Sequence, residues 1–576
     1  MLIQAILAQR FTLAVASLGV ENAPIPLSKS TRPEFGEYQF NGAMALAKQL
    51  KKKPRDIAED ILQAVELSDI ADKCEIAGPG FINIHLSKKW VSQQVQSASA
   101  DERLNIKLAP ARRVVVDYSS PNLAKEMHVG HLRSTIIGDA VVKVLEFLGH
   151  TVIRQNHMGD WGTQFGMLLA HLSDQLDQTQ ASAALSDLED FYRAAKVRFD
   201  NEEGFADRAR EYVVRLQSSD PDCLRLWEQF IDISITHSEE VYKQLQVSLS
   251  RNDVMGESAY NPDLPVLVED LMTRGIAVVD QGATVVFLPE MADKEGNPAV
   301  YIIQKSGGGF LYATTDLAAV RYRCEQLKAD RTLIFTDARQ ALHFKQTELV
   351  SRKAGYMPEA HSYQHCPFGM MLGKDGKPFK TRTGGTIKLA DLLAEAKERA
   401  GKLVATRNPG SPASKDPKIA LTIGIGAVKY ADLSKNRTTD YIFDWDTMLS
   451  FEGNTAPYLQ YAFTRIRSIF RKADVDMASQ QSEVNVENAS EHSLAVKLLQ
   501  FEDTLLAVGN EATPHLLCTY LYELASLFMK FYEASPMLKA DVDEMTKQSR
   551  LTLSALTART LKSGLEMLGI ETLEHM

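Results

Sequence analysis

The sequence predicts an α/β multidomain protein: a parallel-sheet domain with a helical insertion, a small α/β domain before it and an all-α bundle after it. Three observations predict this fold class. The apolar run Val114–Val116 leads through a turn into an amphipathic helical pattern that continues to Leu148. Residues 80–86 alternate as a half-buried strand does. From Leu389 the pattern is helical almost to the end, and 576 residues are too many for one core.

Taken in order, the chain divides into four regions. The strand–turn–helix unit is typical of a Rossmann-type sheet, a charged helical stretch interrupts that domain, and Thr455–Tyr458 begins a long helix. We expect an N-terminal domain at 1–109, a Rossmann-type domain at 110–388 with its insertion at about 172–253, a helical connecting region at 389–453 and an all-α domain at 454–576.

More strands are expected within the Rossmann-type domain. The second strand is expected at Thr151–Arg154. After the insertion, strand-like runs return and are expected to complete the sheet, at Val285–Leu288, Tyr301–Ile303 and Thr332–Phe335, with closure near Phe368–Leu372. The segment Gly373–Thr386 is rich in glycine and cations and is expected to be a mobile loop.

The composition is that of an ordinary soluble protein, with 45% hydrophobic and 24% charged residues. The five cysteines are scattered without a Cys-x-x-Cys pair, which argues against a disulfide framework or zinc ribbon and suits a reducing cytosol. No apolar run approaches a membrane span, so we expect a cytoplasmic protein. The net charge of −10 disfavours nonspecific nucleic-acid binding but allows RNA recognition by a local basic surface.

The most informative stretch runs from Ser120 to His131, where two histidines flank a glycine at a helix start. A helix start offers free N–H groups and partial positive charge, so it attracts phosphate. His128 and His131 could donate to phosphate oxygens where charge grows during attack on an α-phosphate. Gly130 would let a flat nucleotide lie against the backbone. Two surface histidines at a helix cap are the alternative, which the preceding strand and following helix make less favourable.

This stretch resembles the class I aminoacyl-tRNA synthetases, because His128–His131 looks like their first signature motif. Further segments are similar to the arginyl-tRNA synthetase subgroup, namely Ser120–Lys125, Gly159–Gly166, Tyr312 with Asp316, and Lys429–Ser434. The resemblance covers essentially the whole chain. It implies an arginine–tRNA ligase that uses ATP to convert L-arginine to arginyl-adenylate and transfers it to the 3′ end of tRNA(Arg). The resemblance then implies that the tRNA elbow is bound by region 1–109 and that catalysis takes place in region 110–388. The anticodon would be bound by region 454–576.

The resemblance also implies roles around ATP. His128 and His131 would hold the phosphates and Gly130 the adenosine, with Mg²⁺ accompanying ATP and no protein-bound metal. Further ATP contacts are expected from Gly369 and Met370. The second class I signature, Lys-Met-Ser-Lys-Ser, is not present, and its nearest equivalent is Phe379–Arg382. Arginyl-type enzymes often carry a lysine upstream of the first signature instead, so the catalytic lysine role is divided between Lys125 and Lys380.

Selection of arginine requires a site that binds a guanidinium group. A carboxylate and the face of an aromatic ring suit this group well. Tyr312 and Asp316 are four residues apart and would share a helix face. By resemblance they bind the arginine side chain with help from Gln340, while Asp117 and Asn122 hold the α-amino and carboxylate end. From spacing alone, a core aromatic residue at Tyr312 and a helix-start carboxylate at Asp316 would be the favoured interpretation, and it is the resemblance that favours the binding role.

The tRNA contacts are less readable. Phe81 and Asn83 match the aromatic-x-Asn element of the arginyl-type N-terminal domain, which implies stacking and amide hydrogen bonds on an unpaired base. Phe81 on an alternating strand could equally be a core residue. In the C-terminal bundle the candidates are Arg465, Arg467 and Arg471, which could also be a solvated helix face.

The sequence disfavours two other classes of function. A class I synthetase of another specificity is disfavoured because zinc-ligand cysteines and a large editing insertion are absent from the sequence. A nucleotidylyltransferase would be much shorter, and a catalytically silent tRNA-binding paralogue should have lost His128 or His131. We therefore expect a monomeric enzyme whose partners are tRNA(Arg) and L-arginine. We expect no association with a membrane.

Overall fold

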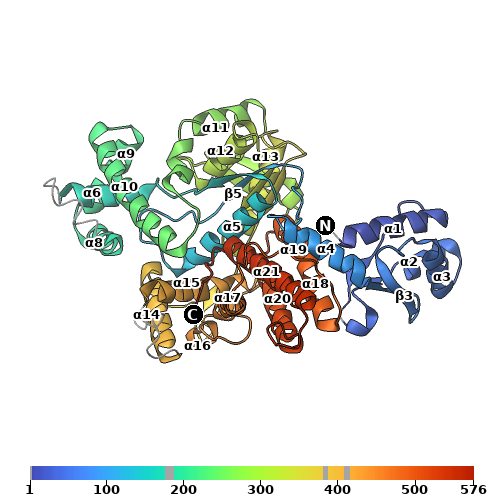
Figure 1. Cartoon of the computed structure of the whole chain (residues 1–576). Coiled ribbons are helices and arrows are strands. Elements are labelled where there is room, and N and C mark those ends of the chain that lie inside the picture. Colours follow the sequence, from blue (N-terminus) through green and yellow to red (C-terminus); the bar gives the residue numbers. More distant parts are fainter. Residues whose placement is uncertain (1–2, 31, 175–186, 381–386, 408–415) are drawn as a thin grey trace.

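The computed structural model describes residues 3–30, 32–174, 187–380, 387–407 and 416–576 (Figure 1). Within these ranges the chain forms parallel and antiparallel sheets followed by a long helical region, so the predicted fold class is confirmed. The part of the glycine-rich loop at 381–386 lies outside the described residues.

The N-terminal region is a four-stranded antiparallel sheet covered by helices, with strand order β1-β2-β4-β3. The strand predicted at residues 80–86 is confirmed as β4. The core face of the sheet carries buried Tyr38, Phe40, Ile82 and Ile84. The elements are α1 (Ile3–Ser17), β1 (Leu27–Lys29), η1 (Pro33–Phe35), β2 (Tyr38–Phe40), α2 (Ala43–Leu50), α3 (Pro54–Ala64), β3 (Ala71–Ala77), β4 (Phe81–Leu86) and α4 (Lys88–Ala100).

The central sheet has four parallel strands in the order β11-β10-β5-β6. Its members are β5 (Arg113–Asp117), β6 (Thr151–Gln155), β10 (Arg331–Ile334) and β11 (Ser362–His365), and α5 (Val129–Phe147) crosses over from β5 to β6. The chain continues from β5 to one side and from β10 to the other, so the two loops diverge at the carboxyl ends of these strands. Such a switch point is where open α/β sheets bind ligands.

Two of the predicted strands lie in a different sheet. β7 (Val278–Asp280), β8 (Ala283–Leu288) and β9 (Ala299–Gln304) form a separate antiparallel sheet, so the expectation that Val285–Leu288 and Tyr301–Ile303 complete the parallel sheet was wrong. The reason is local, because β7 and β8 are joined by Gln281 and Gly282, both with positive φ. A two-residue turn of that kind makes an antiparallel hairpin. This sheet packs on α11 (Leu264–Thr273), α12 (Tyr312–Glu325) and α13 (Ala341–Lys353).

The insertion projects to one side of the central sheet (Figure 1). Its described elements are helical, as the sequence predicts, and are α6 (Thr163–Asp174), α8 (Leu188–Asn201), α9 (Phe205–Gln217) and α10 (Pro221–Leu245). After α10 the chain returns through η2 (Arg251–Asp253) and η3 (Glu257–Tyr260) to the edge of the central sheet.

The last third of the chain is mostly helical. The helix predicted to start at Thr455–Tyr458 is confirmed, because the Thr455 hydroxyl accepts the first-turn N–H of Tyr458 at 3.2 Å. The expected closure of the central sheet near Phe368–Leu372 was wrong, because β12 (Met371–Leu372) pairs in parallel with β13 (Tyr441–Ile442) in a separate two-stranded sheet. β13 was not predicted from the sequence. The helices are α14 (Leu389–Arg407), α15 (Pro417–Leu433), α16 (Trp445–Met448), α17 (Ala456–Ala473), α18 (Ala489–Leu499), α19 (Phe501–Glu511), α20 (His515–Ala534) and α21 (Glu544–Met567).

The C-terminal helices pack against α5, the helix that follows the first strand of the central sheet. Helices α15, α19 and α21 all pack against α5, and α4 packs against α18 and α21, which joins the N-terminal region to the bundle (Figure 1). Helix α5 is therefore held by elements from distant parts of the sequence. None of the described helices has the length and apolar character needed to cross a bilayer.

Candidate active site

The turn after β5 has a strained backbone that hydrogen bonds hold in place. Ser119 and Ser120 both adopt positive φ, at 69° and 46°. Such conformations cost free energy in residues other than glycine and gather at functional sites. The Ser119 amide donates to Ser134 Oγ, and the Ser120 amide donates to Asn156 Oδ1, each at 2.9 Å. The strain therefore lies at the switch point of the sheet.

The two histidines of the motif form a reciprocal capping box at the start of α5. The Gly130 amide donates to Nδ1 of His128 at 3.0 Å, and the His128 amide donates to Nδ1 of His131 at 3.1 Å. Burial lowers the pKa of His131 to about 3, with the His128 ring adding to the effect, and burial also lowers the pKa of His128. Both rings are thus neutral at pH 7, and since each Nδ1 accepts, the proton is on Nε2. The helix start presents two N–H donors of fixed tautomer.

Gly130 is required by the His128 ring itself. A Cβ atom at this position would lie 2.7 Å from Cε1 and 2.9 Å from Nδ1 of His128. The His128 and His131 rings lie with centroids 4.0 Å apart. The absence of a side chain lets His128 fold over the helix start, a constraint beyond the nucleotide contact expected from the sequence.

The two candidate lysines lie in different settings. Lys125 is exposed, and its Nζ lies 4.2 Å from the centroid of the Tyr192 ring in α8. Lys380 is also exposed and is the last described residue before the gap at 381–386. Thr381 and Arg382, which belong to the nearest equivalent of the second signature, lie outside the described residues. The division of the role between Lys125 and Lys380 stays a prediction.

Gly369 and Met370 lie between β11 and β12 and contact the segment that precedes β13. The Gly369 amide donates to the Arg437 carbonyl at 2.9 Å, and the Met370 amide donates to Asp440 Oδ1 at 2.6 Å. A Cβ on Gly369 would lie 2.6 Å from Asp440 Oδ1, so a side chain has no room there. The Met370 side chain is 43% exposed and available to a ligand.

Tyr312 and Asp316 both lie on α12, as the spacing predicts. His343 Nε2 lies 2.6 Å from Asp316 Oδ2, and the Tyr312 ring meets the His343 ring edge-on at 4.8 Å. Tyr312 is 63% exposed, which is inconsistent with a core aromatic residue. Gln340 is exposed at the end of η5 (Ala338–Gln340), directly before α13.

Asp117 and Asn122 lie in different environments. Asp117 is buried, with Arg323 NH2 at 2.5 Å and the Ser120 hydroxyl donating to it at 2.8 Å. Burial opposes its charge, but Arg323 and His157 hold the pKa of Asp117 well below its usual range. Asn122 is exposed, and its Oδ1 accepts from the Ala124 amide at 3.0 Å and from Gln164 Nε2 at 2.9 Å. Both of these hydrogen bonds use Oδ1, and neither uses the Nδ2 group.

The structure adds three residues that the sequence did not single out, His157, Glu257 and Tyr260. His157 Nδ1 lies 3.6 Å from Asp117 Oδ2, and its ring meets that of Tyr260 at 5.4 Å. Within the described ranges, His157 Nε2 and the Tyr260 hydroxyl are buried without a hydrogen-bond partner. Orphaned polar atoms of this kind call for an explanation, such as a polar ligand.

Glu257 begins η3, at the point where the chain returns from the insertion. Burial raises its pKa to about 7, opposed by His157 and reinforced by the carboxylates of Asp316 and Asp160. A perturbed carboxyl beside a second carboxylate is a candidate functional group. Nothing in the sequence marked it, because it is separated from Asp316 by an antiparallel sheet and a helix.

The candidate tRNA-binding residues are less exposed, and more engaged in contacts within the protein, than the sequence suggested. Phe81 is half-buried on the face of β4 opposite the core, and Asn83 is 1% exposed, its Oδ1 accepting from Gln39 Nε2 at 2.7 Å. In the C-terminal bundle, Arg467 Nε lies 2.7 Å from Glu574 Oε2, and Arg471 donates to the Glu574 carbonyl at 3.0 Å. The Arg465 guanidinium lies 4.7 Å from the Tyr532 ring centroid.

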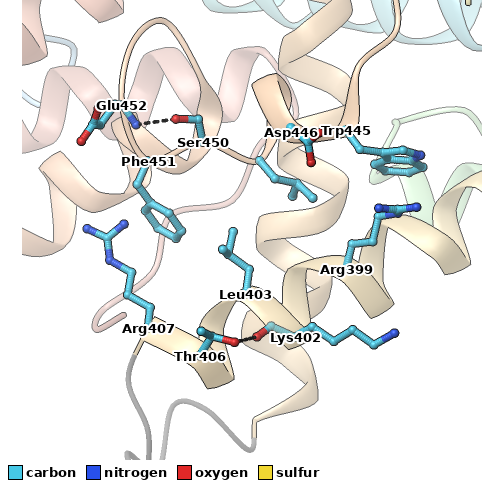
Figure 2. Close-up of a pocket in the computed structure, with 11 residues that line it drawn as sticks. Arg399, Lys402, Leu403, Thr406, Arg407, Trp445, Asp446, Ser450, Phe451 and Glu452 are labelled. Carbon is cyan, nitrogen blue, oxygen red and sulfur yellow. Dashed lines mark hydrogen bonds between the residues drawn. The ribbon is translucent and has the colours of Figure 1, made fainter.

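A separate cavity of about 600 Å³ lies between α14 and the segment from Trp445 to Glu452 (Figure 2). We call it the basic–aromatic cavity, because cations of α14 face aromatic rings on the opposite segment, where the carboxylates of Asp446 and Glu452 also line the cavity. Arg399 lies 5.0 Å from the Trp445 ring centroid, and Arg407 lies 4.2 Å from that of Phe451. Lys402 adds a third cation on the same helix (Figure 2). Cations paired with aromatic rings suit nucleic acid, where rings stack on bases and cations meet phosphates.

Comparisons with known proteins agree along the whole chain. Family models match an arginyl-tRNA synthetase N-terminal domain at residues 2–86, a class I tRNA synthetase (R) catalytic domain at 94–445 and a DALR anticodon-binding domain at 459–576. The arginine–tRNA ligase of Alteromonas mediterranea is 70% identical and that of Colwellia psychrerythraea 60%, each covering 100% of both chains.

Solved structures agree with these sequence relatives. The arginyl-tRNA synthetase of Plasmodium falciparum superposes with a TM-score of 0.86 at 28% identity, covering 100% of this chain and 99% of that one. The Thermus thermophilus arginyl-tRNA synthetase has the same fold, with a TM-score of 0.84 at 23% identity over 100% of both chains. The chain therefore belongs to the class I arginyl-tRNA synthetases, ATP-using enzymes that charge tRNA with arginine.

Proposed function

We propose that the start of α5 and the carboxyl ends of β5 and β10 form the site where ATP and L-arginine react to give arginyl-adenylate. The observation that carries this proposal is the capping box, which fixes His128 and His131 as neutral Nε2–H donors at a helix N-terminus. Transfer to the 3′ end of tRNA(Arg) follows in the same site.

In the first step an arginine carboxylate oxygen attacks the α-phosphate and pyrophosphate leaves. Negative charge grows on the phosphate oxygens, where the two imidazole N–H groups and the helix N-terminus stabilise it. Neutral donors of fixed tautomer need no proton movement during the step. Mg²⁺ enters with ATP as part of the substrate, bound to phosphate oxygens. Lys125 or Lys380 supplies a further cation, and Gly369 and Met370 lie along the adenosine.

The side chain of arginine binds between Tyr312, Asp316 and Glu257. Its guanidinium has five N–H donors in a plane, which two carboxylates and an aromatic wall can satisfy. Support comes from the electrostatic coupling of Glu257 to Asp316 and from the exposed Tyr312 ring. Gln340 assists at the rim. Guanidinium binding favours the ionised form of Glu257 and so lowers its pKa from about 7.

The α-amino and carboxylate end of arginine lies toward β5. Asn122 Nδ2 donates to the carboxylate, and Asp117 attracts the ammonium. Because Asp117 already pairs with Arg323, its attraction acts within a network that includes Ser120 and His157. His157 belongs to this network, and its Nε2 atom is buried without a hydrogen-bond partner within the described ranges.

The tRNA contacts lie outside the catalytic site. Phe81 stacks on an unpaired base of the tRNA elbow, and Asn83 acts through Gln39, which it holds by a hydrogen bond. The all-α bundle binds the anticodon, and the basic–aromatic cavity contacts the tRNA backbone.

The five cysteines are free, which fits a cytoplasmic location. We also propose that the enzyme is a monomer, which light scattering coupled to size exclusion would test.

The central test separates the two substrate sites. Asp316→Asn keeps the shape of the side chain but removes the charge that faces the guanidinium, so arginine affinity should fall while ATP affinity is retained. Binding of each substrate is measured alone by calorimetry. Equal loss of both affinities, or loss of neither, would contradict the assignment of Asp316. Aminoacylation across the twenty amino acids then tests specificity directly.

A further inference from the structure

The first turns of α8, in the helical insertion, lie against the turn that precedes α5. Two contacts join them. The Lys125 ammonium lies over the Tyr192 ring at 4.2 Å from its centroid. Asp187, the N-cap residue of α8, pairs with Lys388 at 2.8 Å, and Lys388 also pairs with Glu126 at 3.1 Å. The insertion thus contacts this turn at two neighbouring points, Lys125 and, through Lys388, Glu126.

The second contact is anchored to the active-site backbone. The Val129 amide donates to the Ile387 carbonyl at 3.1 Å, and the Leu389 amide donates to the Met127 carbonyl at 3.0 Å. Residues 127–129 and 387–389 therefore form a short antiparallel ladder that carries Lys388. Because Asp187 binds this lysine, α8 stays attached to the turn even when the contact of Tyr192 is removed.

The contact between Lys125 and Tyr192 has a different character. Among the described residues no ion pair or hydrogen bond involves Lys125 Nζ, so the ring is its partner. A carboxylate in that place would neutralise the lysine and compete with ATP for it. An aromatic face attracts the cation weakly, leaves its charge intact and restricts its side-chain rotamers. A lysine held this way loses less entropy when phosphate arrives.

We propose that Tyr192 is a positioning residue for adenylate formation, whose ring keeps Lys125 aimed at the ATP phosphates. The inference rests on the proposed role of Lys125 as a phosphate-binding cation. A cation–π contact at an exposed site shifts an equilibrium by about two- to fivefold. Loss of the ring should therefore raise KM for ATP by that factor, leave KM for arginine unchanged and lower kcat little.

The experiment compares Tyr192→Leu with Tyr192→Phe in the full-length enzyme, using arginine-dependent pyrophosphate exchange with tRNA present. The phenylalanine variant keeps the ring and should match wild type. The control is Tyr212→Leu on α9, whose ring also lies under a cation, Arg215, at 4.9 Å but away from Lys125. Thermal unfolding of each variant verifies that the insertion is folded.

Two further variants, Lys125→Gln and the double variant of Lys125→Gln with Tyr192→Leu, separate the role of Tyr192 from the role of Lys125. We expect Lys125→Gln to raise KM for ATP and Tyr192→Leu to add nothing to it, because the ring acts through the lysine. An unchanged KM for ATP in Lys125→Gln would remove the proposed role of Lys125 itself. If Lys125→Gln is impaired but Tyr192→Leu behaves like Tyr192→Phe, or if the two effects are additive, the positioning role of Tyr192 is overturned and the lysine role stands.

Discussion

Lys429 Nζ lies 2.7 Å from the carbonyl oxygen of Gly569, to which it donates a hydrogen bond. It also donates to the Leu245 carbonyl at 2.7 Å. One buried amine in α15 thereby joins the end of the insertion to the end of α21. From α5, Asp139 and Lys143 face the same point. Burial and Lys143 lower the pKa of Lys429 to about 7, against the opposing effect of Asp139.

Lys429→Met should change how stability depends on pH. The folded-state pKa is about 7 and the ordinary value is 10.5, so between these pH values the unfolded chain binds more protons. Stability from this group therefore rises as pH rises through that window, by at most about 1.4 kcal/mol per pH unit. The difference between wild type and variant is measured from urea midpoints at pH 7, 8 and 9. A difference independent of pH would contradict the neutral buried amine.

Gly130→Ala should impair adenylation without unfolding the protein. The added Cβ would lie 2.7 Å from the His128 ring and displace it, removing an N-cap hydrogen bond worth about 1 kcal/mol. Pyrophosphate exchange should fall while arginine affinity is kept. The matched control is Gly401→Ala in α14, where the Cβ would meet Ala420 at an ordinary 3.5 Å. Equal activity of the two variants would show that the ring geometry does not matter.

His131→Ala should lower the adenylation rate far more than it weakens arginine binding. Loss of one preorganised donor to a developing oxyanion typically costs about 2.7–4 kcal/mol, which corresponds to about a hundred- to a thousandfold. Because burial holds the pKa of His131 near 3, the wild-type ring stays neutral down to mildly acid pH and adds no pH dependence near pH 7. Single-turnover rates measure the effect, and near-normal rates would refute the role.

The elements that the sequence predicted correctly are those that short-range patterns of residues determine. The strand, turn and helix around Val114–Phe147 and the start of α17 follow from apolar periodicity and capping residues. The sheet to which β8 and β9 belong depends on long-range pairing, which an apolar run does not specify. Glu257 is a site candidate only because folding buries it near Asp316, and the pairing of Asp117 with Arg323 joins two distant segments. Such neighbours have no signature in the sequence around them.

Arginine binding should depend on pH through Glu257. Its pKa of about 7 in the free enzyme means that part of the population is protonated at pH 7 and must lose a proton when a guanidinium binds. KM for arginine should therefore rise as pH falls from 8 to 6. In Glu257→Gln the affinity should be lower and this dependence lost, while the neighbouring His157, Asp160 and Asp316 are unchanged. A pH profile that is identical in the variant would assign the dependence to one of those neighbours.

Arg407→Ala should weaken tRNA binding without affecting either small substrate. Arg407 is exposed at the rim of the basic–aromatic cavity, with its guanidinium over the Phe451 ring (Figure 2). The centroid of the Tyr461 ring lies 5.7 Å from the same guanidinium. A cation that meets a phosphate contributes to the salt dependence of binding, so its removal should reduce the slope of log K against log salt by about 1. KM for tRNA should rise several-fold, and the constants for ATP and arginine should stay at their wild-type values.

The matched control for Arg407→Ala is Lys294→Ala. This exposed cation lies between β8 and β9, in the separate antiparallel sheet, and its removal changes the net charge by the same amount. A general electrostatic effect of the acidic chain would lower tRNA affinity equally in both variants. A loss confined to Arg407→Ala, with the reduced salt slope, assigns the effect to the cavity. An unchanged slope in Arg407→Ala would remove the cavity from the tRNA-binding surface, leaving the elbow and anticodon contacts to carry the affinity.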